Sequence, residues 1–189
     1  MKRDEIDFVP VVLVGGSSTR FGRDKLLEPV GGSLLVDHPI RALREATGAA
    51  VFVVGECDAR VAARADGVIA DPYPGTGPIG GVLAAIDFAK RDVVVLAGDL
   101  PGIDAAAVRL LLDAAAANPG ASAVVGRCGD RVHPTIGVYR VACAEALRAA
   151  MASGRRSLGR AVPEGCRVEV EIPAAAVVNV NRREDLLGE

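Results

Sequence analysis

A glycine-rich segment near the N-terminus brings two cations to a backbone that can turn tightly. Residues 13–25 have the sequence LVGGSSTRFGRDK and follow an apolar run that begins at Val9. The apolar run predicts a buried strand, and glycines after a strand let backbone N–H groups point at anionic oxygens. Arg20 and Lys25 would then neutralise a polyphosphate. We interpret the segment as a phosphate cradle, with a surface turn carrying two solvated cations as the alternative.

The spacing within this segment excludes two common nucleotide-binding loops. A Walker A loop needs a glycine, four residues and then Gly-Lys-Ser/Thr, whereas Arg23 and Asp24 separate Gly22 from Lys25 here. The dinucleotide fingerprint needs Gly-x-Gly-x-x-Gly, but the first two glycines of this chain are adjacent. Any phosphate binding must therefore use another class of loop.

A carboxylate, Asp99, follows the clearest strand pattern of the chain, at residues 92–97. Gly98 permits close approach of a ligand, and Pro101 directs the chain away. A carboxylate at the end of a strand can hold Mg²⁺, which commonly binds few carboxylates together with phosphate oxygens. The alternative is an aspartate that forms a turn before a proline. The phosphate cradle favours the metal-binding interpretation.

A second Gly/Pro-rich segment follows another aspartate. Asp71 ends a predicted strand and precedes residues 72–81, PYPGTGPIGG, which lead into a helix. This segment could wall the base or ribose of a nucleotide with backbone groups. A plain connecting loop is the alternative.

Three further groups carry weaker signals. His133 could act as a general base, although a lone histidine is more often a structural hydrogen-bonding group. Arg155 and Arg156 suit a second anion or a solvated helix end. Asn179 and Asn181 could recognise the edge of a heterocycle or cap the last helix.

Composition limits the classes of protein to consider. A chain of 189 residues suits one domain, 1–189, and 50% hydrophobic residues can build a sizeable core. A net charge of −2 argues against general attraction to nucleic acid or to anionic membranes. The four cysteines form no CxxC pair, which indicates a reduced protein. No signal peptide or membrane span is evident, so we expect a cytoplasmic location.

The elements that must position these residues alternate between strands and helices. Continuous apolar strand patterns favour a parallel sheet covered on both faces, and their succession with helices predicts an α/β fold. Ligands in such sheets lie beyond the carboxyl ends of the strands, where the cradle, Asp71 and Asp99 would meet. Residues 33–47 also have a helical pattern, and Pro39 within it predicts either a kink or a start delayed to about Asp37. Strands are predicted at residues 51–54, 67–70, 92–97, 121–125, 135–139, 166–172 and 176–180, and helices at 33–47, 79–90, 105–117 and 141–151.

Taken in order, these segments resemble the molybdenum cofactor guanylyltransferase family over residues 13 to about 186. The first motif is shared by many sugar and cofactor nucleotidyltransferases, whereas the ordered set is more specific. The set consists of LxGGxSxRFGxDK at 13–25, Asp71, GPIGG at 77–81, GDxP at 98–101, HP at 133–134, GRR at 154–156 and NVN at 179–181.

The resemblance implies a three-layer, Rossmann-like nucleotidyltransferase fold with a mostly parallel central sheet. It implies transfer of GMP from GTP to the terminal phosphate of molybdopterin with release of pyrophosphate, and a requirement for Mg²⁺. It assigns catalysis to Arg20, Lys25 and Asp99, and the metal to Asp99. The implied nucleotide contacts are Leu13, Val14, Gly15, Gly16, Lys25, Asp71, Gly80 and Asp99, and the implied pterin contacts are His133, Arg155, Arg156, Asn179 and Asn181.

Departures from the family pattern leave alternatives open. Phe21 stands where methionine is usual, and Gly55 stands where some members have asparagine. A cytidylyltransferase, a sugar- or alditol-phosphate nucleotidyltransferase and a non-catalytic nucleotide-binding docking domain therefore remain alternatives. We expect a monomer. Proteins that deliver molybdopterin or mature molybdoenzymes are the expected partners.

Overall fold

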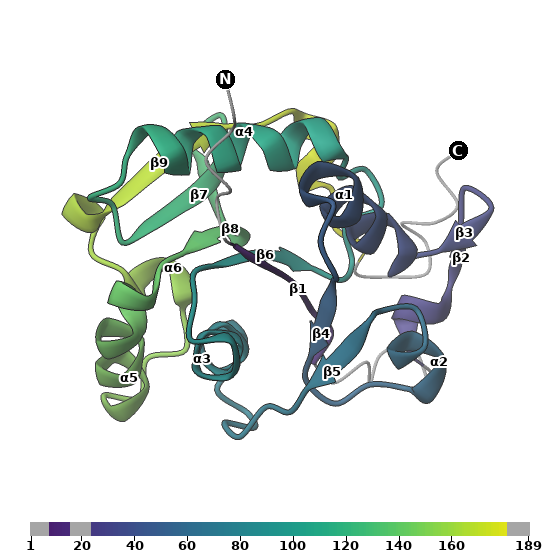
Figure 1. Ribbon diagram of the computed structural model, residues 1–189, viewed down its shortest axis with the longest axis horizontal. Coiled ribbons are helices and arrows are strands. Elements are labelled where there is room, and N and C mark those ends of the chain that lie inside the picture. The colour runs from purple at the N-terminus through teal and green to yellow at the C-terminus, as the bar shows by residue number, and fades with distance from the viewer. Residues whose placement is uncertain (1–7, 16–23, 181–189) are drawn as a thin grey trace.

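The computed structural model describes residues 8–15 and 24–180, and its centre is a mostly parallel sheet. Seven strands lie in the order β5-β4-β1-β6-β8-β7-β9 (Figure 1). Among the described strands of this seven-stranded sheet, only β8 runs antiparallel to both of its neighbours. This arrangement confirms the predicted α/β class. The strands are β1 Val9–Leu13, β4 Phe52–Val54, β5 Gly67–Ile69, β6 Val93–Ala97, β7 Ala123–Cys128, β8 Arg131–Tyr139 and β9 Arg167–Glu171.

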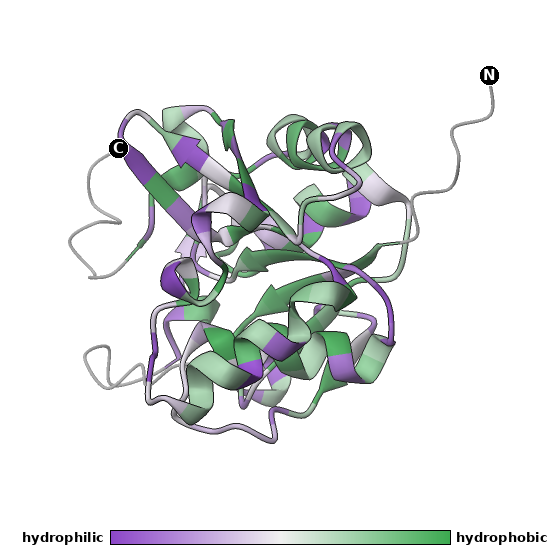
Figure 2. Ribbon diagram, turned by 90° about the vertical axis from the view of Figure 1, so that its left-hand side faces the viewer, coloured by the Kyte–Doolittle hydropathy of each residue, from purple (hydrophilic) through white to green (hydrophobic). Residues whose placement is uncertain are grey.

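Helices cover both faces of this sheet and complete three layers (Figure 1). Helices α1 (Asp37–Thr47) and α4 (Ala105–Ala117) share one apolar core with Val12 and Leu96. Helices α3 (Pro78–Ala89), α5 (Ala144–Ala152) and α6 (Leu158–Ala161) share the other with Val11 and Val95. Neighbouring residues of one strand thus enter opposite cores, because strand side chains alternate between faces. Figure 2 shows the hydrophobic strands between the helical layers.

Local signals set several helix ends as predicted. Helix α1 begins at Asp37, so Pro39 lies in its first turn, where no intrahelical N–H bond is lost. The Asp104 carboxylate accepts a hydrogen bond of 2.8 Å from the Ala107 amide and begins α4. Gly48, with φ of +69°, ends α1.

One predicted strand is wrong. Residues 176–180 were expected to be extended, but Ala174–Val177 form a 3₁₀ turn. Pro173 begins this turn, and its carbonyl accepts a 3.0 Å hydrogen bond from the Ala176 amide. Val180 then donates its amide to the carbonyl of Asp99 instead of joining the sheet.

The sequence patterns also missed short elements that have too few residues for a periodic signal. A hairpin joins β2 (Pro29–Val30) to β3 (Ser33–Leu34), and its two glycines have positive φ. Helices α2 (Ala59–Ala62) and α6 have four residues each. The other short elements are 3₁₀ turns at η1 Lys25–Leu27, η2 Val141–Cys143 and η3 Glu164–Cys166. Across residues 8–15 and 24–180 the helices are too short or too polar to span a membrane.

Candidate nucleotide-binding site

The carboxyl ends of the parallel strands meet at one edge of the sheet, as predicted. Along this edge Asp71 follows β5, Gly55 follows β4, Gly15 follows β1 and Asp99 follows β6. Because β8 is antiparallel, its first residues, including His133, come to the same edge. The strands that precede Asp71 and Asp99, β5 and β6, are three strand spacings apart, about 14 Å. The edge can therefore hold an extended ligand.

An ion pair between Lys25 and Asp99 lies at the centre of this edge. The Lys25 ammonium is 2.7 Å from Oδ2 of Asp99, and the two side chains are 22% and 15% exposed. The ammonium also donates to the Val180 carbonyl at 3.2 Å, and the Val180 amide donates to the Asp99 carbonyl at 3.1 Å. Lys25 and Asp99, 74 positions apart in the chain, thus lie in contact at the predicted sheet edge. The segment that contains Asn179 reaches the same place through Val180.

The turn that carries Lys25 is anchored at both ends. Asp24 caps it, since its Oδ1 accepts a hydrogen bond of 3.0 Å from the Leu26 amide. The Leu26 side chain is buried and packs over Gly98, where an added Cβ would lie 3.1 Å from Leu26 Cδ2. The glycine before Asp99 is therefore required by packing of the lysine turn. Sequence reasoning missed this capping role of Asp24, although an aspartate before Lys-Leu-Leu is a recognisable N-cap signal.

The backbones after β1 and β4 approach each other closely. Gly55 has φ of +109°, and a Cβ added there would lie 2.8 Å from both Cα and N of Gly15. A side chain at position 55 is thus excluded by both conformation and space. Val14 is only 7% exposed and donates its amide to Val54, while the Leu13 carbonyl accepts from Gly98. Any ligand contact from Val14 must come mainly from its backbone.

Asp71 and Gly80 have local structural partners. Asp71 Oδ1 accepts a hydrogen bond of 2.8 Å from the Tyr73 amide, which shapes the start of the Gly/Pro-rich loop. A Cβ on the buried Gly80 would overlap Oγ1 of Thr76, so this glycine lets the loop fold onto α3. These contacts explain both residue types without a ligand, and their nucleotide contacts stay predictions.

The loop with Arg155 and Arg156 lies near the start of α3, and α6, which follows this loop, packs on Pro134 of β8. The Arg156 carbonyl is 3.7 Å from the position of a Cβ on Gly77, and an added Cβ on Gly159 would be 2.9 Å from Pro134. Both arginines are exposed. Partial burial, and secondarily the charge of Arg131, lowers the pKa of His133. His133 and the arginine pair therefore come from adjoining segments, and their pterin contacts stay predictions.

Some predicted residues lie outside the described part of the chain: Gly16, Arg20 and Asn181. Within residues 8–15 and 24–180, histidine, cysteine, aspartate and glutamate form no group of three or more suited to a metal. The described residues around Asp99 therefore do not form a site that would hold a metal by protein ligands alone.

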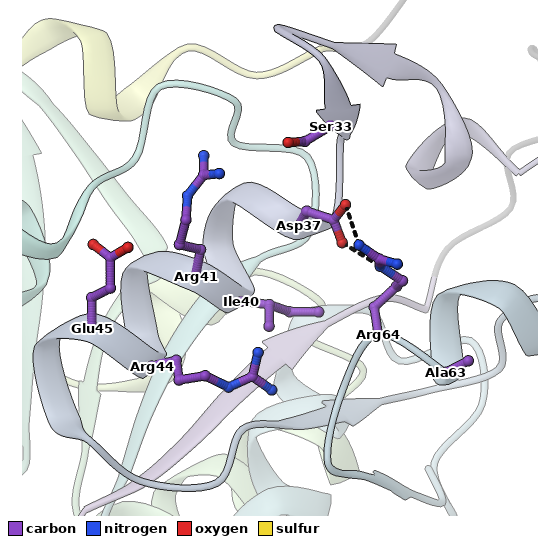
Figure 3. A pocket seen from close by; sticks show the side chains of 8 residues that line it. All are labelled: Ser33, Asp37, Ile40, Arg41, Arg44, Glu45, Ala63 and Arg64. Atoms are coloured by element: carbon purple, nitrogen blue, oxygen red, sulfur yellow. Dashed lines mark hydrogen bonds and ion pairs between the residues drawn. The ribbon is translucent and has the colours of Figure 1, made fainter.

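A groove of about 440 Å³ lies along α1, among residues that carry none of the predicted chemistry (Figure 3). Arg64 faces Asp37 there and forms two hydrogen bonds with it, of 2.6 and 2.9 Å. Arg44 pairs with Asp66 at 2.7 Å. Arg44 and Arg64 thus have carboxylate partners, while Arg41 contacts Nδ1 of His38 at 3.2 Å.

This strand order, with a lysine turn after β1 and an acid after β6, is the α/β arrangement expected of a Rossmann-like nucleotidyltransferase. The chain resembles the structure of molybdopterin-guanine dinucleotide biosynthesis protein A from Archaeoglobus fulgidus, with a TM-score of 0.75, 22% identity and 95% coverage of both chains. At this identity the likeness establishes the fold.

Sequence comparison establishes the family. Residues 10–166 match the model of the MobA-like NTP transferase domain, and the chain belongs to this family. It is 34% identical over 185 residues to a probable molybdenum cofactor guanylyltransferase of Opitutus terrae, covering 92% of this chain and 90% of that one. It is 33% identical to the molybdenum cofactor guanylyltransferase of Pseudomonas syringae pv. syringae, with coverages of 89% and 87%.

Proposed function

We propose that the chain transfers GMP from GTP to the terminal phosphate of molybdopterin, forming molybdopterin guanine dinucleotide and pyrophosphate. Family membership supports the reaction class, and the names of the relatives support the substrates. The observation that carries the proposal is the Lys25 ammonium 2.7 Å from Asp99, at the sheet edge where ligands of α/β folds bind.

The chemistry requires positioning and charge neutralisation more than proton transfer. An oxygen of the molybdopterin phosphate would attack the α-phosphorus of GTP, and the bond from that phosphorus to the β-phosphate oxygen would break. The attacking phosphate is already ionised near neutral pH, so no general base is needed. Lys25, together with Arg20, would stabilise the charge that moves onto pyrophosphate.

Asp99 suits Mg²⁺ that is shared with a nucleotide. Its carboxylate is a hard oxygen donor at the sheet edge, and Mg²⁺ commonly binds one or two carboxylates plus phosphate oxygens. When bound, Mg²⁺ would supply Lewis-acid stabilisation of the phosphate charge. Lys25 would then leave Asp99 for the triphosphate, so both groups keep a partner of opposite charge.

Pyrophosphate release tests the proposal and the choice of base. We expect release from GTP with molybdopterin as acceptor and Mg²⁺ present, and much less from CTP. Gly55 leaves no side chain at that position to read the base, so the CTP comparison is essential. Release with sugar or alditol phosphates but not with molybdopterin would overturn the proposed acceptor. GTP binding without turnover on any of these acceptors would indicate a docking domain.

We also propose that the protein acts as a monomer in the cytoplasm and meets proteins that deliver molybdopterin or mature molybdoenzymes. Its four cysteines are free thiols, which supports a reducing compartment. Light scattering on the purified chain, with and without GTP, tests the oligomeric state.

A further inference from the structure

We propose, on the basis of the nucleotide site proposed above, that Asp24 is a positioning residue for Lys25. Its carboxylate links the start of the lysine turn to the loop between β4 and α2. The link fixes the direction from which the ammonium approaches the triphosphate. Asp24 itself need not touch either substrate.

Two backbone N–H groups from separate segments converge on this one carboxylate. Oδ1 accepts from Leu26, the second residue of the turn, at 3.0 Å. Oδ2 accepts from the amide of Asp58, which begins α2, at 3.4 Å. The charge of Asp24 also reaches the intervening loop, because it adds to the effect of burial in raising the pKa of Cys57. Asp24 therefore couples the turn to the β4–α2 loop.

Only a carboxylate of this size offers acceptors to both donors. An ionised aspartate accepts at both oxygens and donates at neither, whereas asparagine would present an N–H₂ group to one of the amides. The negative charge also strengthens hydrogen bonds from backbone N–H groups. Asp24→Asn thus removes one link while keeping the size of the side chain.

Lys25 needs this control because its ammonium serves two acceptors from distant parts of the chain. It donates to Asp99 Oδ2 at 2.7 Å and to the Val180 carbonyl at 3.2 Å. Packing of Leu26 over Gly98 holds the far side of the turn, and Asp24 holds its start. A carboxylate beside the cradle lowers the local positive charge, so attraction to phosphate does not explain why an aspartate stands at position 24. Positioning of the Lys25 side chain does explain it.

A double-mutant cycle on GTP binding tests the proposal. Isothermal titration with Mg²⁺ and GTP would compare wild type, Asp24→Asn, Lys25→Met and the double variant. We expect Asp24→Asn to weaken binding about tenfold, as for loss of a charge-assisted hydrogen bond. In the Lys25→Met background the same change should have almost no effect, because a positioning residue acts through the lysine. Equal weakening in both backgrounds, or none in either, would overturn the proposal.

Two further variants separate positioning from folding. Asp104→Asn alters another helix-capping aspartate, at the start of α4, and should leave GTP affinity unchanged. Asp24→Ser keeps an oxygen for Leu26 and loses the one that faces Asp58, so it should weaken binding as Asp24→Asn does. Wild-type affinity in Asp24→Ser would show that the link to α2 has no role.

If wild type binds GTP normally but fails in pyrophosphate release, the proposed reaction fails while the cycle still tests Asp24. Absence of GTP binding in wild type would overturn both.

Discussion

Lys25 and Asp99 pair with each other because each would otherwise be a partly buried, unpaired charge. Their side chains are 22% and 15% exposed, so solvent screens them only in part. Breaking such a pair by removal of one partner costs more than the pair itself contributes. A bound triphosphate would replace Asp99 as the anionic partner of Lys25, and Mg²⁺ would replace Lys25 as the cationic partner of Asp99. The pair would form again when the product leaves.

Asp99→Asn should lower kcat at least about 100-fold, since the reaction would lose the carboxylate proposed to hold Mg²⁺. The amide retains the size of the side chain but leaves the Lys25 ammonium without its ion-pair partner, so the thermal unfolding temperature should also fall, and kcat is compared at a temperature where the variant remains folded. Steady-state pyrophosphate release at saturating Mg²⁺ measures the effect. Asp113→Asn, at an exposed position of α4, is the matched control and should keep wild-type kcat. Near-normal turnover in Asp99→Asn would contradict the metal assignment.

His133 should titrate below its usual pKa of 6.5, because burial and Arg131 disfavour its charged form. The unfolded chain then binds a proton at a higher pH than the folded chain does. Stability is therefore lost as the pH falls through this range. His133→Gln should lose less stability than wild type between pH 7 and pH 5 in urea unfolding. An NMR titration that gives a pKa above 6.5 would contradict this expectation.

At the scale of elements, the site depends on how the lysine turn packs on the end of β6. Gly98 is the contact point, since its amide donates to Leu13 while Leu26 covers its Cα. The end of β1, the turn and the residue before Asp99 are thus one packed unit. A small change in this unit moves Lys25 relative to Asp99.

Gly98→Ala should impair catalysis more than it impairs folding. The new methyl group would lie 3.1 Å from Leu26 and 3.2 Å from the Leu13 carbonyl, so the turn must shift. We expect destabilisation of about 1–3 kcal/mol and a marked fall in kcat/KM for GTP. Gly120→Ala, which has open space around its Cα, should match wild type in both. Urea unfolding and pyrophosphate release provide the two measurements, and an unchanged kcat/KM in Gly98→Ala would contradict this packing role.

Sequence patterns predicted long elements well because their signals are local. Asp104 and the apolar periodicity after it placed α4 at Ala105–Ala117. At Pro39 the sequence left a kink or a delayed start as alternatives, and the structure has the delayed start, at Asp37. The expected strand at residues 176–180 was wrong because its pairing partner is decided by tertiary contacts. Val180 bonds to the Asp99 carbonyl, a partner far away in the chain.

At the scale of the whole molecule, the two apolar cores decide which groups solvent can reach. Cys143 is buried in the core that contains α3, and burial raises the pKa of its thiol to about 12. Cys166, which follows α6 in the sequence, is exposed to solvent. The thiols of one reduced protein should therefore differ widely in reactivity.

Alkylation of the native protein at pH 8 should modify Cys166 quickly and Cys143 only after unfolding. Burial denies the reagent access to Cys143, and its raised pKa leaves almost no thiolate at this pH. Peptide mass mapping over time, with and without urea, measures the order. Modification of Cys143 in the native protein at the rate of Cys166 would contradict the described core.

The sequence by itself determined the α/β class, the cradle motif and the convergence of the cradle, Asp71 and Asp99 on one sheet edge. These follow from residue types and from the rule that parallel strands end at the same edge. Tertiary structure alone decided that Gly55 must lack a side chain, that Val180 joins the Lys25–Asp99 centre and that Asp24 links the lysine turn to α2. Each depends on a contact of a few ångströms between distant segments, which no local pattern encodes.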